Sequence, residues 1–248
     1  MRALLPRPSS DVDLVEAYAT PPAIPSGRPF VRCNMVAALD GAITVNGRSG
    51  GLGGPGDRLV FQVLRAVADV VLVGAGTARA EHYSPVRLDD AAREQRLARR
   101  QSPVPPIAVV TGSGALDWSA PFFTDAEARP IVITTREGEA EVQRGASGLA
   151  EVVVAGDVRV DMAVALEALG AGGHRNVLLE GGPGLNADVI RSGLLDELCL
   201  TVSPHLVGGD GPRVLAGPAL DPPLHLALVH VLEEDGLLFL RLAVEKGG

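Results

Sequence analysis

Six polar side chains stand at the ends of apolar runs or in the turns that follow them, where side chains are placed to do chemistry. Carboxyl groups serve proton transfer, and arginine, with its planar fork of donors, serves phosphate or carboxylate recognition. In α/β proteins, polar groups that converge at the carboxyl ends of strands form the ligand site. We therefore expect one ligand site that draws on residues far apart in the chain: Asn34, Asp40, Ser49, Glu81, Arg87 and Glu180.

The stretch VLLEGGPGLN, Val177 to Asn186, ends an apolar run on Glu180 and continues into three glycines. Gly181, Gly182 and Gly184 would leave backbone N–H groups bare at the start of a helix, where these donors and the helix dipole together favour a phosphate. A dinucleotide pyrophosphate fits this pattern. A tight connection that holds no ligand is the alternative.

A second glycine turn follows another apolar run, in VLVGAGTARAE, Val71 to Glu81. Gly74 and Gly76 occupy the first two places of the dinucleotide fingerprint, but the third falls on Arg79, so a Rossmann motif is not predicted. A strand and a flexible turn remain. Thr77 then either caps a helix or hydrogen-bonds a ligand.

Several other chemistries lack their sequence signatures. The five histidines show no HExxH or HxH spacing and no CxxC accompanies them, so no metal site is predicted. No GxSxG is present, and Lys246, near the C-terminus, is the one lysine available for a Schiff base. Cys33 and Cys199 lie in apolar alternating runs, which predicts buried thiols and not a disulfide.

Composition indicates a packed protein whose ligand is small. The 248 residues are 46% hydrophobic, and the formal net charge of −8 argues against a nucleic-acid-binding face. No apolar run approaches the length of about 20 residues that spans a bilayer. The N-terminal MRALLPRPSSD is too short in apolar residues for a signal peptide, so we expect a cytoplasmic protein without nucleic-acid or membrane partners.

Short runs rich in Val, Ile and Leu recur along the chain, and helix-like segments separate several of them. This alternation predicts an α/β sheet with helices on both sides. The runs are FVRCNMV, DVVLV, PIAVV, PIVITT, EVVVA, NVLLE, ELCLTV, LHLALVHVL and LLFLRLAV. EEDG joins the last two, and its Asp-Gly predicts a β-hairpin, which makes a mostly parallel sheet mixed.

Helical periodicity is clearest in two segments. One begins at Asp57, and its apolar stripe consists of Leu59, Val60, Val63, Leu64 and Val67. The other opens at Gly184 and places Leu185, Val189 and Ile190 inward. Arg58 and Arg65 share a face roughly opposite the first stripe, so they turn either to solvent or to a ligand from the next layer.

The chain is predicted to consist of an N-terminal extension, residues 1–28, and one domain, residues 29–248. The extension has a short helical pattern with Ser10 as a possible cap, followed by the stiff stretch TPPAIPSGRP. The charged segment AAREQRLARR, Ala91 to Arg100, is predicted to be a solvated surface helix or loop and not a binding patch.

Several motifs in order resemble the reductase domain of riboflavin biosynthesis. NMVAALDGAITVNGRSGGLGGPGDRLVFQVLRAVADVVLVGAGTARAE matches that family's first half, and LLEGGPGLN with GLLDELCLTVSPHLVGGDGPRVL looks like its C-terminal signature. Within this family, the chain most resembles the stand-alone branch, which has no zinc deaminase domain. It implies a dihydrofolate-reductase-like fold, a three-layer αβα sandwich, together with NADPH as the hydride donor and a homodimer.

The resemblance also assigns cofactor positions. Thr77 and Glu81 fall on cofactor-contacting places, with Glu81 where the family usually has aspartate, and the loop from Gly182 to Asn186 falls on the pyrophosphate place. The expected cofactor positions in and beside the two glycine turns are Gly74, Gly76, Thr77, Glu81, Gly181, Gly182, Pro183, Gly184, Leu185 and Asn186. Thr135, the last residue of the run PIVITT, and Arg136, which follows it, are candidates for the 2′-phosphate because arginine suits a ribose phosphate.

Substrate positions follow in the same way. Ser49, Arg65 and Glu180 fall on substrate places of the family, Arg87 lies near one, and Asn34 stands where many members have lysine near the substrate. The resemblance implies 5-amino-6-(5-phosphoribosylamino)uracil as the substrate, with its ribosyl group reduced to a ribityl chain.

Other positions depart from the family's pattern. Gly51 sits where an aromatic residue often stacks, and His82 and Tyr83 replace an Asp-Pro pair. These departures bear on the substrate more than on the cofactor.

The expected reaction is hydride transfer from NADPH to C1′ of the ring-opened ribosyl group, with the protein orienting the reactants. Glu81 is the candidate acid because a carboxyl group desolvated against the nicotinamide would have a raised pKa. Alternatively, Glu81 only positions the cofactor. Two other functions stay open: reduction of a pterin in the manner of dihydrofolate reductase, and an NADPH-binding module without catalysis.

Overall fold

The computed structural model describes residues 1–19 and 27–245. Positions 20–26 of the stretch TPPAIPSGRP lie outside the described residues. Helices formed by the described residues are all too short or too polar to cross a bilayer.

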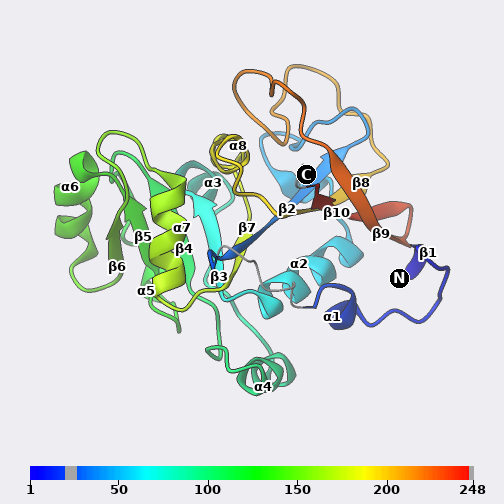
Figure 1. Cartoon of the computed structure of the whole chain (residues 1–248), viewed down its shortest axis with the longest axis horizontal. Helices are drawn as coiled ribbons and strands as arrows, with labels where there is room; N and C mark the ends of the chain where they lie inside the picture. Colours follow the sequence, from blue (N-terminus) through cyan, green and yellow to red (C-terminus); the bar gives the residue numbers. More distant parts are fainter. Residues whose placement is uncertain (20–26, 246–248) are drawn as a thin grey trace.

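A single ten-stranded sheet forms the middle layer, in the order β1-β9-β10-β8-β2-β7-β3-β4-β5-β6 (Figure 1). The strands are β1 (Arg2–Leu5), β2 (Phe30–Ala38), β3 (Val70–Gly74), β4 (Ile107–Thr111), β5 (Ile131–Thr134), β6 (Glu151–Val154), β7 (Asn176–Leu179), β8 (Glu197–Ser203), β9 (Leu226–Glu234) and β10 (Leu237–Val244). Every apolar run named above is a strand. The pairs from β8 through β2 to β6 are parallel, and the remaining pairs are antiparallel.

Helices cover both faces of the sheet. They are α1 (Leu14–Ala17), α2 (Pro55–Val67), α3 (Ala75–Ala80), α4 (Asp90–Ala98), α5 (Pro121–Thr124), α6 (Arg136–Ala146), α7 (Met162–Ala171) and α8 (Pro183–Arg191). One core joins α2, α3, α5 and α6 to the sheet, and a second core joins α7 and α8 to its other face. Strand β3 has its four valine and leucine side chains fully buried between the two cores, so the three-layer α/β prediction is confirmed.

Helix α2 begins two residues before the predicted start, with Pro55 in its first turn, where a missing N–H costs nothing. Val60, Leu64 and Val67 are buried as the stripe predicted, but Leu59 is 45% exposed, so its inward placement was wrong. The core beneath α2 covers only part of the apolar stripe, and Leu59 lies beyond its edge. Helix α8 buries Leu185 and Val189 as expected.

The C-terminal hairpin is confirmed. Strands β9 and β10 pair in antiparallel register and turn at Asp235 and Gly236, both with positive φ. Figure 1 shows this hairpin at the opposite end of the molecule from α6. The N-terminal residues continue the same sheet, because β1 pairs with β9 at its edge.

Helix α1 is held by a buried ion cluster. Arg32 and Arg241 both bind the carboxylate of Glu197, and their guanidinium groups donate to the carbonyls of Tyr18 and Ala17 at the end of the helix. The helix is capped by Asp13 and not by Ser10, since the Asp13 side chain accepts from the backbone of Glu16 at 3.0 Å. The sequence placed the cap one turn too early.

Within the charged segment AAREQRLARR, helix α4 is mostly on the surface, but Arg96 is fully buried. Its guanidinium donates to the carbonyls of Ala66 and Ala68 at the end of α2 and to the carbonyl of Ser102. Burial lowers the pKa of Arg96 to about 10. A wholly solvated segment was therefore the wrong prediction for Arg96, because the end of α2 needs donors for its last carbonyls.

We expect the free energy of unfolding to fall at acid pH because of His230. This side chain is buried beside the ring of Tyr18, and its Nε2 has no hydrogen-bond partner in the described residues. Burial, then the charge of Arg241, lowers its pKa to about 4. The unfolded chain, with a histidine pKa near 6.5, binds the proton first, so stability is lost as pH falls from about 6.5 to about 4.

The measurement is denaturant unfolding at pH 7 and pH 5 for the wild type and His230→Gln. One such group contributes at most about 1.4 kcal/mol per pH unit. The wild type should lose more stability than the variant between these pH values. Parallel pH dependence in the two proteins would show that His230 is not the group responsible.

Candidate active site

A cavity of about 510 Å³ opens where β2, β3 and β7 end beside α2 and α3. Eight of the residues singled out from the sequence line it: Asn34, Ser49, Arg65, Thr77, Glu81, Glu180, Gly182 and Pro183. They come from five segments spread over 150 positions of the chain, and parallel strands ending at one edge of the sheet bring them together.

At the centre of the cavity wall, Glu180 binds Arg65 through both of its oxygens. The guanidinium Nε lies 2.8 Å from Oε1, and Nη2 lies 2.7 Å from Oε2. The Tyr83 hydroxyl donates to Oε2 at 2.6 Å. Both ionic side chains are largely buried, with 14% of Arg65 and 2% of Glu180 exposed. Arg65 therefore turns toward the cavity, which resolves the two orientations that the helical spacing left open.

Ring contacts and electrostatics hold Arg65 and Tyr83 in place as donors. The Arg65 guanidinium lies 4.1 Å from the centre of the Phe61 ring and 5.5 Å from that of Tyr83. Burial, and then the charge of Glu180, raises the pKa of Tyr83. Burial opposes the charge on Arg65, but Glu180 outweighs it and raises the pKa of the guanidinium. Tyrosine and arginine thus both remain donors to Glu180 at neutral pH.

Glu81 ends helix α3 and faces the same cavity. Its Oε1 accepts a hydrogen bond of 2.9 Å from the backbone N–H of Ser49, the first residue of a short 3₁₀ turn. This bond orients one carboxylate oxygen, and none of the described residues donates a hydrogen bond to the other. The arrangement suits both roles considered above for Glu81, proton donation and cofactor positioning.

The two glycine turns lie against each other at the cavity. The Gly74 N–H donates to the Gly181 carbonyl at 2.7 Å, and the peptide between Gly181 and Gly182 is cis. A Cβ on Gly182 would lie 2.3 Å from Oγ1 of Thr77, so only glycine fits there. Thr77 lies inside α3, whose N-cap is Gly74, and so its hydroxyl faces the second turn and caps nothing.

Open space lies above the backbone of both turns. A Cβ placed on Gly76 or Gly184 would meet no atom within 4 Å. Helix α8 begins at Pro183 without a side-chain cap, so its first N–H groups have no partner within the helix. These observations fit an anionic ligand that approaches the start of α8 closely.

At two positions of the expected pyrophosphate loop, the side chain packs in the core or hydrogen-bonds within the protein. Leu185 is buried in the core beneath α8. The Asn186 amide donates to the Val214 carbonyl at 2.9 Å, and its oxygen faces the Cys33 thiol at 3.6 Å. Only the backbones of these two residues are free to meet a ligand.

Nine of the expected ligand contacts are not among the residues that line the cavity: Gly74, Gly76, Arg87, Thr135, Arg136, Gly181, Gly184, Leu185 and Asn186. Arg87 is exposed and binds Glu127 at 2.8 Å. Thr135 caps α6 through the N–H of Gly138 at 3.0 Å, and Arg136, 71% exposed, lies 3.4 Å from Glu139. Their ligand roles stay predictions.

Asp40 also lies outside the cavity. Its carboxylate accepts from the N–H groups of Val207 and Gly208, and these bonds lower its pKa. Asp40 thus joins the turn after β2 to the loop that contains Val207 and Gly208, and this accounts for a polar residue at this position.

Asp57, Phe61, His82 and Tyr83 are among the lining residues that the sequence did not single out as site residues. Phe61 carried a detectable signal, since it precedes Arg65 by four positions on one helix. His82 and Tyr83 appeared only as departures from the family. His82 adopts a positive φ of 50°, and this turn directs Tyr83 toward Glu180.

The two cysteines are buried and free, as predicted. Burial raises the pKa of Cys33, and it raises that of Cys199 to about 12, so neither is a nucleophile. No group of three histidine, cysteine or acidic residues gathers as a metal site within residues 1–19 and 27–245.

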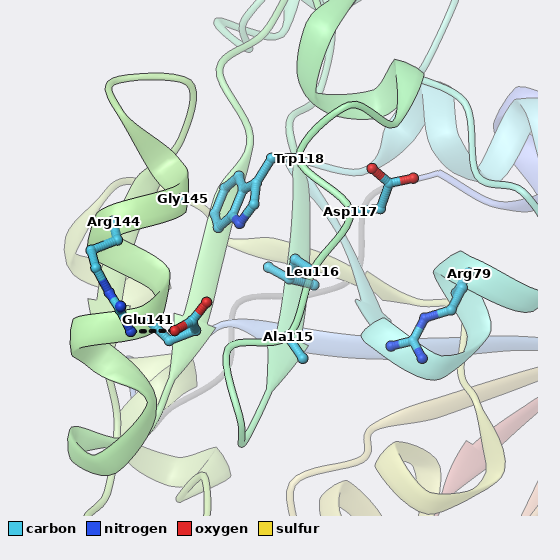
Figure 2. Close-up of a pocket in the computed structure, with 8 residues that line it drawn as sticks. All are labelled: Arg79, Ala115, Leu116, Asp117, Trp118, Glu141, Arg144 and Gly145. Atoms are coloured by element: carbon cyan, nitrogen blue, oxygen red, sulfur yellow. Dashed lines mark hydrogen bonds and ion pairs between the residues drawn. The ribbon is translucent and has the colours of Figure 1, made fainter.

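Another cavity, of about 550 Å³, lies between α3, the loop after β4 and α6. Figure 2 shows Arg79 on the far side of this cavity from the ion pair of Glu141 and Arg144, with Trp118 against Gly145. Its charged side chains are exposed on the surface, and none of the residues expected at the ligand site lines it.

Comparison with known proteins identifies similar sequences. The sequence model of the RibD C-terminal domain matches residues 29–237. The chain is 33% identical over 192 residues to the 2,5-diamino-6-ribosylamino-4(3H)-pyrimidinone 5′-phosphate reductase of Archaeoglobus fulgidus, a match that covers 77% of this chain and 87% of the relative. Identity to the Aquifex aeolicus protein of the same name is 31% over 196 residues, with 77% and 83% covered.

Solved structures show the same fold. A pyrimidine reductase-like protein from Corynebacterium diphtheriae is 26% identical and superposes with a TM-score of 0.84 over 95% of this chain and 100% of that one. A diaminohydroxyphosphoribosylaminopyrimidine deaminase/5-amino-6-(5-phosphoribosylamino)uracil reductase from Thermotoga maritima has a TM-score of 0.71 at 22% identity, covering 88% of this chain and 57% of its own. The second likeness concerns the fold alone.

Proposed function

Because the chain belongs to the RibD C-terminal domain family, we propose that it is an NADPH-dependent pyrimidine reductase of riboflavin biosynthesis. It reduces the ribosyl group of a 5-phosphoribosylamino pyrimidine, such as 5-amino-6-(5-phosphoribosylamino)uracil, to a ribityl chain. The observation that carries the proposal is one cavity lined by Thr77 and Gly182, one from each glycine turn, and by the buried pair of Arg65 and Glu180.

The cofactor's place is supported by the glycine turns. NADPH, when bound, supplies the hydride that reduces C1′. The bare N–H groups at the start of α8 would hold its pyrophosphate, and Gly76 and Gly184 have no side chain to keep it away. Thr77 and Glu81, which line the cavity beside these turns, would orient the nicotinamide end.

The substrate's place is supported by the polar cluster. Arg65 and Glu180 hold each other in a fixed geometry, so they can present oriented charges to the substrate's hydroxyl and amino groups without reorganising. Reduction of the ring-opened imine adds one hydride to C1′ and one proton to the adjacent nitrogen. Glu81 is the proposed source of that proton.

Replacing Glu81 by glutamine should lower kcat about 10²-fold, because glutamine keeps an oxygen for the Ser49 N–H but cannot donate the proton. The Kd for NADPH, measured by calorimetry, should change by less than about threefold. Glu137→Gln on the exposed surface of α6 is the matched control. Normal turnover in the Glu81 variant would remove Glu81 as the acid and leave it a positioning residue.

Substrate class is tested by steady-state NADPH oxidation. We expect the phosphorylated pyrimidine to be the better substrate when its kcat/KM is compared with that of dihydrofolate. An advantage for dihydrofolate would overturn the proposal in favour of a pterin reductase.

We propose that two chains form a homodimer through the sheet face opposite α2. Cys199 and Phe239 pack toward α2, so the alternate residues of β8 and β10 point the other way. These are half-exposed and apolar: Leu198, Leu200, Val202, Leu238, Leu240 and Leu242. The neighbouring Leu228 is 49% exposed. Light scattering that gives the mass of one chain would contradict the dimer.

A further inference from the structure

Asp57 is a carboxylate of the cavity wall that none of the roles above uses. It lies in the first turn of α2 and lines the cavity with Asn34 and Val36 of β2. The Thr201 hydroxyl of β8 donates to its Oδ1 at 2.7 Å. In the described part of the chain, this is the one hydrogen bond that the carboxylate receives.

Its geometry differs from that of a carboxylate that only supports a helix start. Gly54 is the N-cap and contributes no side-chain bond, and Asp57 reaches across to the strand instead of accepting from its own first turn. Thr201 is paired with Val36 in the sheet, so the bond fixes the carboxylate over the strands that form the cavity floor. Within residues 1–19 and 27–245, Oδ2 meets no donor.

Burial leaves this carboxylate under-solvated. Desolvation raises the pKa of Asp57, and the Thr201 bond and the charge of Arg58 offset it only in part. A half-buried carboxylate with one hydrogen bond is completed best by a ligand with two parallel N–H donors, one for each oxygen.

The two pyrimidines named for the relatives differ at this point. A 2,5-diamino-4(3H)-pyrimidinone carries the N3–H and the 2-amino group side by side, which match the two oxygens of a carboxylate. A uracil has a carbonyl in place of the 2-amino group, and its oxygen would face a carboxylate oxygen with no proton between them. The uracil carbonyl oxygen and the carboxylate oxygen would then face each other as two buried acceptors, which disfavours binding of the uracil.

We propose that the Asp57 carboxylate accepts hydrogen bonds from the pyrimidine N3–H and 2-amino group. The chain would then prefer the 2,5-diaminopyrimidinone over the uracil. The inference rests on the proposed function and adds a specificity-determining residue to it. Asparagine at this position would reverse the pattern, because its oxygen accepts from N3–H while its amide donates to the uracil carbonyl.

The test compares the two 5′-phosphates, diaminopyrimidinone and uracil, in kcat/KM and in Kd by calorimetry with the oxidised cofactor NADP⁺ present. The wild type should favour the diaminopyrimidinone by about 10- to 100-fold. Asp57→Asn should abolish or invert this preference. Thr201→Val removes the hydrogen bond to Oδ1. It should reduce the preference for the diaminopyrimidinone, but by less than Asp57→Asn does. Circular dichroism and denaturant unfolding check that the variants fold.

The matched control is Asp90→Asn on the exposed surface of α4, which should keep the wild-type ratio. A preference that is the same in wild type and Asp57→Asn, in Kd as well as in kcat/KM, would overturn the role of Asp57. Failure of the proposed function is separable: an Asp57-dependent preference in Kd without turnover of either compound would support this inference and contradict the reductase assignment.

Discussion

Replacing Glu180 by glutamine is expected to lower kcat/KM for the phosphorylated pyrimidine by about 10²- to 10³-fold. The change removes the counter-charge from Arg65, whose guanidinium is held between Phe61 and Tyr83. Glutamine can accept from one of the two arginine donors but places an amide N–H₂ against the other. Both charges that the cavity presents to the substrate would therefore be misplaced together.

Stability should fall in the same variant. Breaking one partner of a buried ion pair costs about 3 kcal/mol or more, because the other charge stays buried without compensation. Denaturant unfolding measures this loss, and assays below the unfolding transition separate it from the loss of activity. Glu167→Gln, on the exposed side of α7, is the matched control and should behave as wild type. A Glu180→Gln enzyme with unaltered kcat/KM would remove the pair from the substrate site.

The second large effect is expected from Gly182→Ala. The new Cβ would lie 2.3 Å from Oγ1 of Thr77, so one of the two glycine turns must shift. A displacement of about 1 Å in a positioning element can cost about 10²-fold, and we expect the Kd for NADPH to rise by about that factor. Fluorescence titration with NADPH measures it.

Two further variants separate the clash from the loss of the ligand surface. Gly184→Ala meets no protein atom within 4 Å, so it should leave stability unchanged and still weaken NADPH, because its methyl group would occupy the ligand's space. Gly172→Ala at the end of α7 meets ordinary contacts of 3.4 Å or more outside the cavity and serves as the control. NADPH affinity that is unchanged in both Gly182→Ala and Gly184→Ala would contradict a cofactor on these turns.

Local patterns accounted for most of the fold. The strand runs, α2, α8 and the hairpin each carry their signal within about a dozen residues, in the period of the apolar side chains and in turn residues such as Asp235 and Gly236. The edge strand β1 carries no comparable signal. Its four residues become a strand because β9, more than 220 positions away, offers them an open edge.

The residues that strand ends and family resemblance both singled out lie together in the structure, and their ligand roles stay predictions. Arg65, Thr77, Glu81 and Glu180 do line one cavity. Contacts that depend on a turn or on distant partners were not predictable. Arg87 faces Glu127 instead of the cavity, and Asp57 owes its orientation to Thr201, 144 positions away.

The proposed function is tested most directly by following the transferred hydrogen. The purified chain is incubated with NADPH that carries deuterium on C4 of the nicotinamide and with the phosphoribosylamino pyrimidine, and the product is analysed by mass spectrometry and NMR. We predict one deuterium per molecule, located on C1′ of a ribityl chain. A product without deuterium at C1′, or deuterium on the pyrimidine ring, would contradict the proposed reduction.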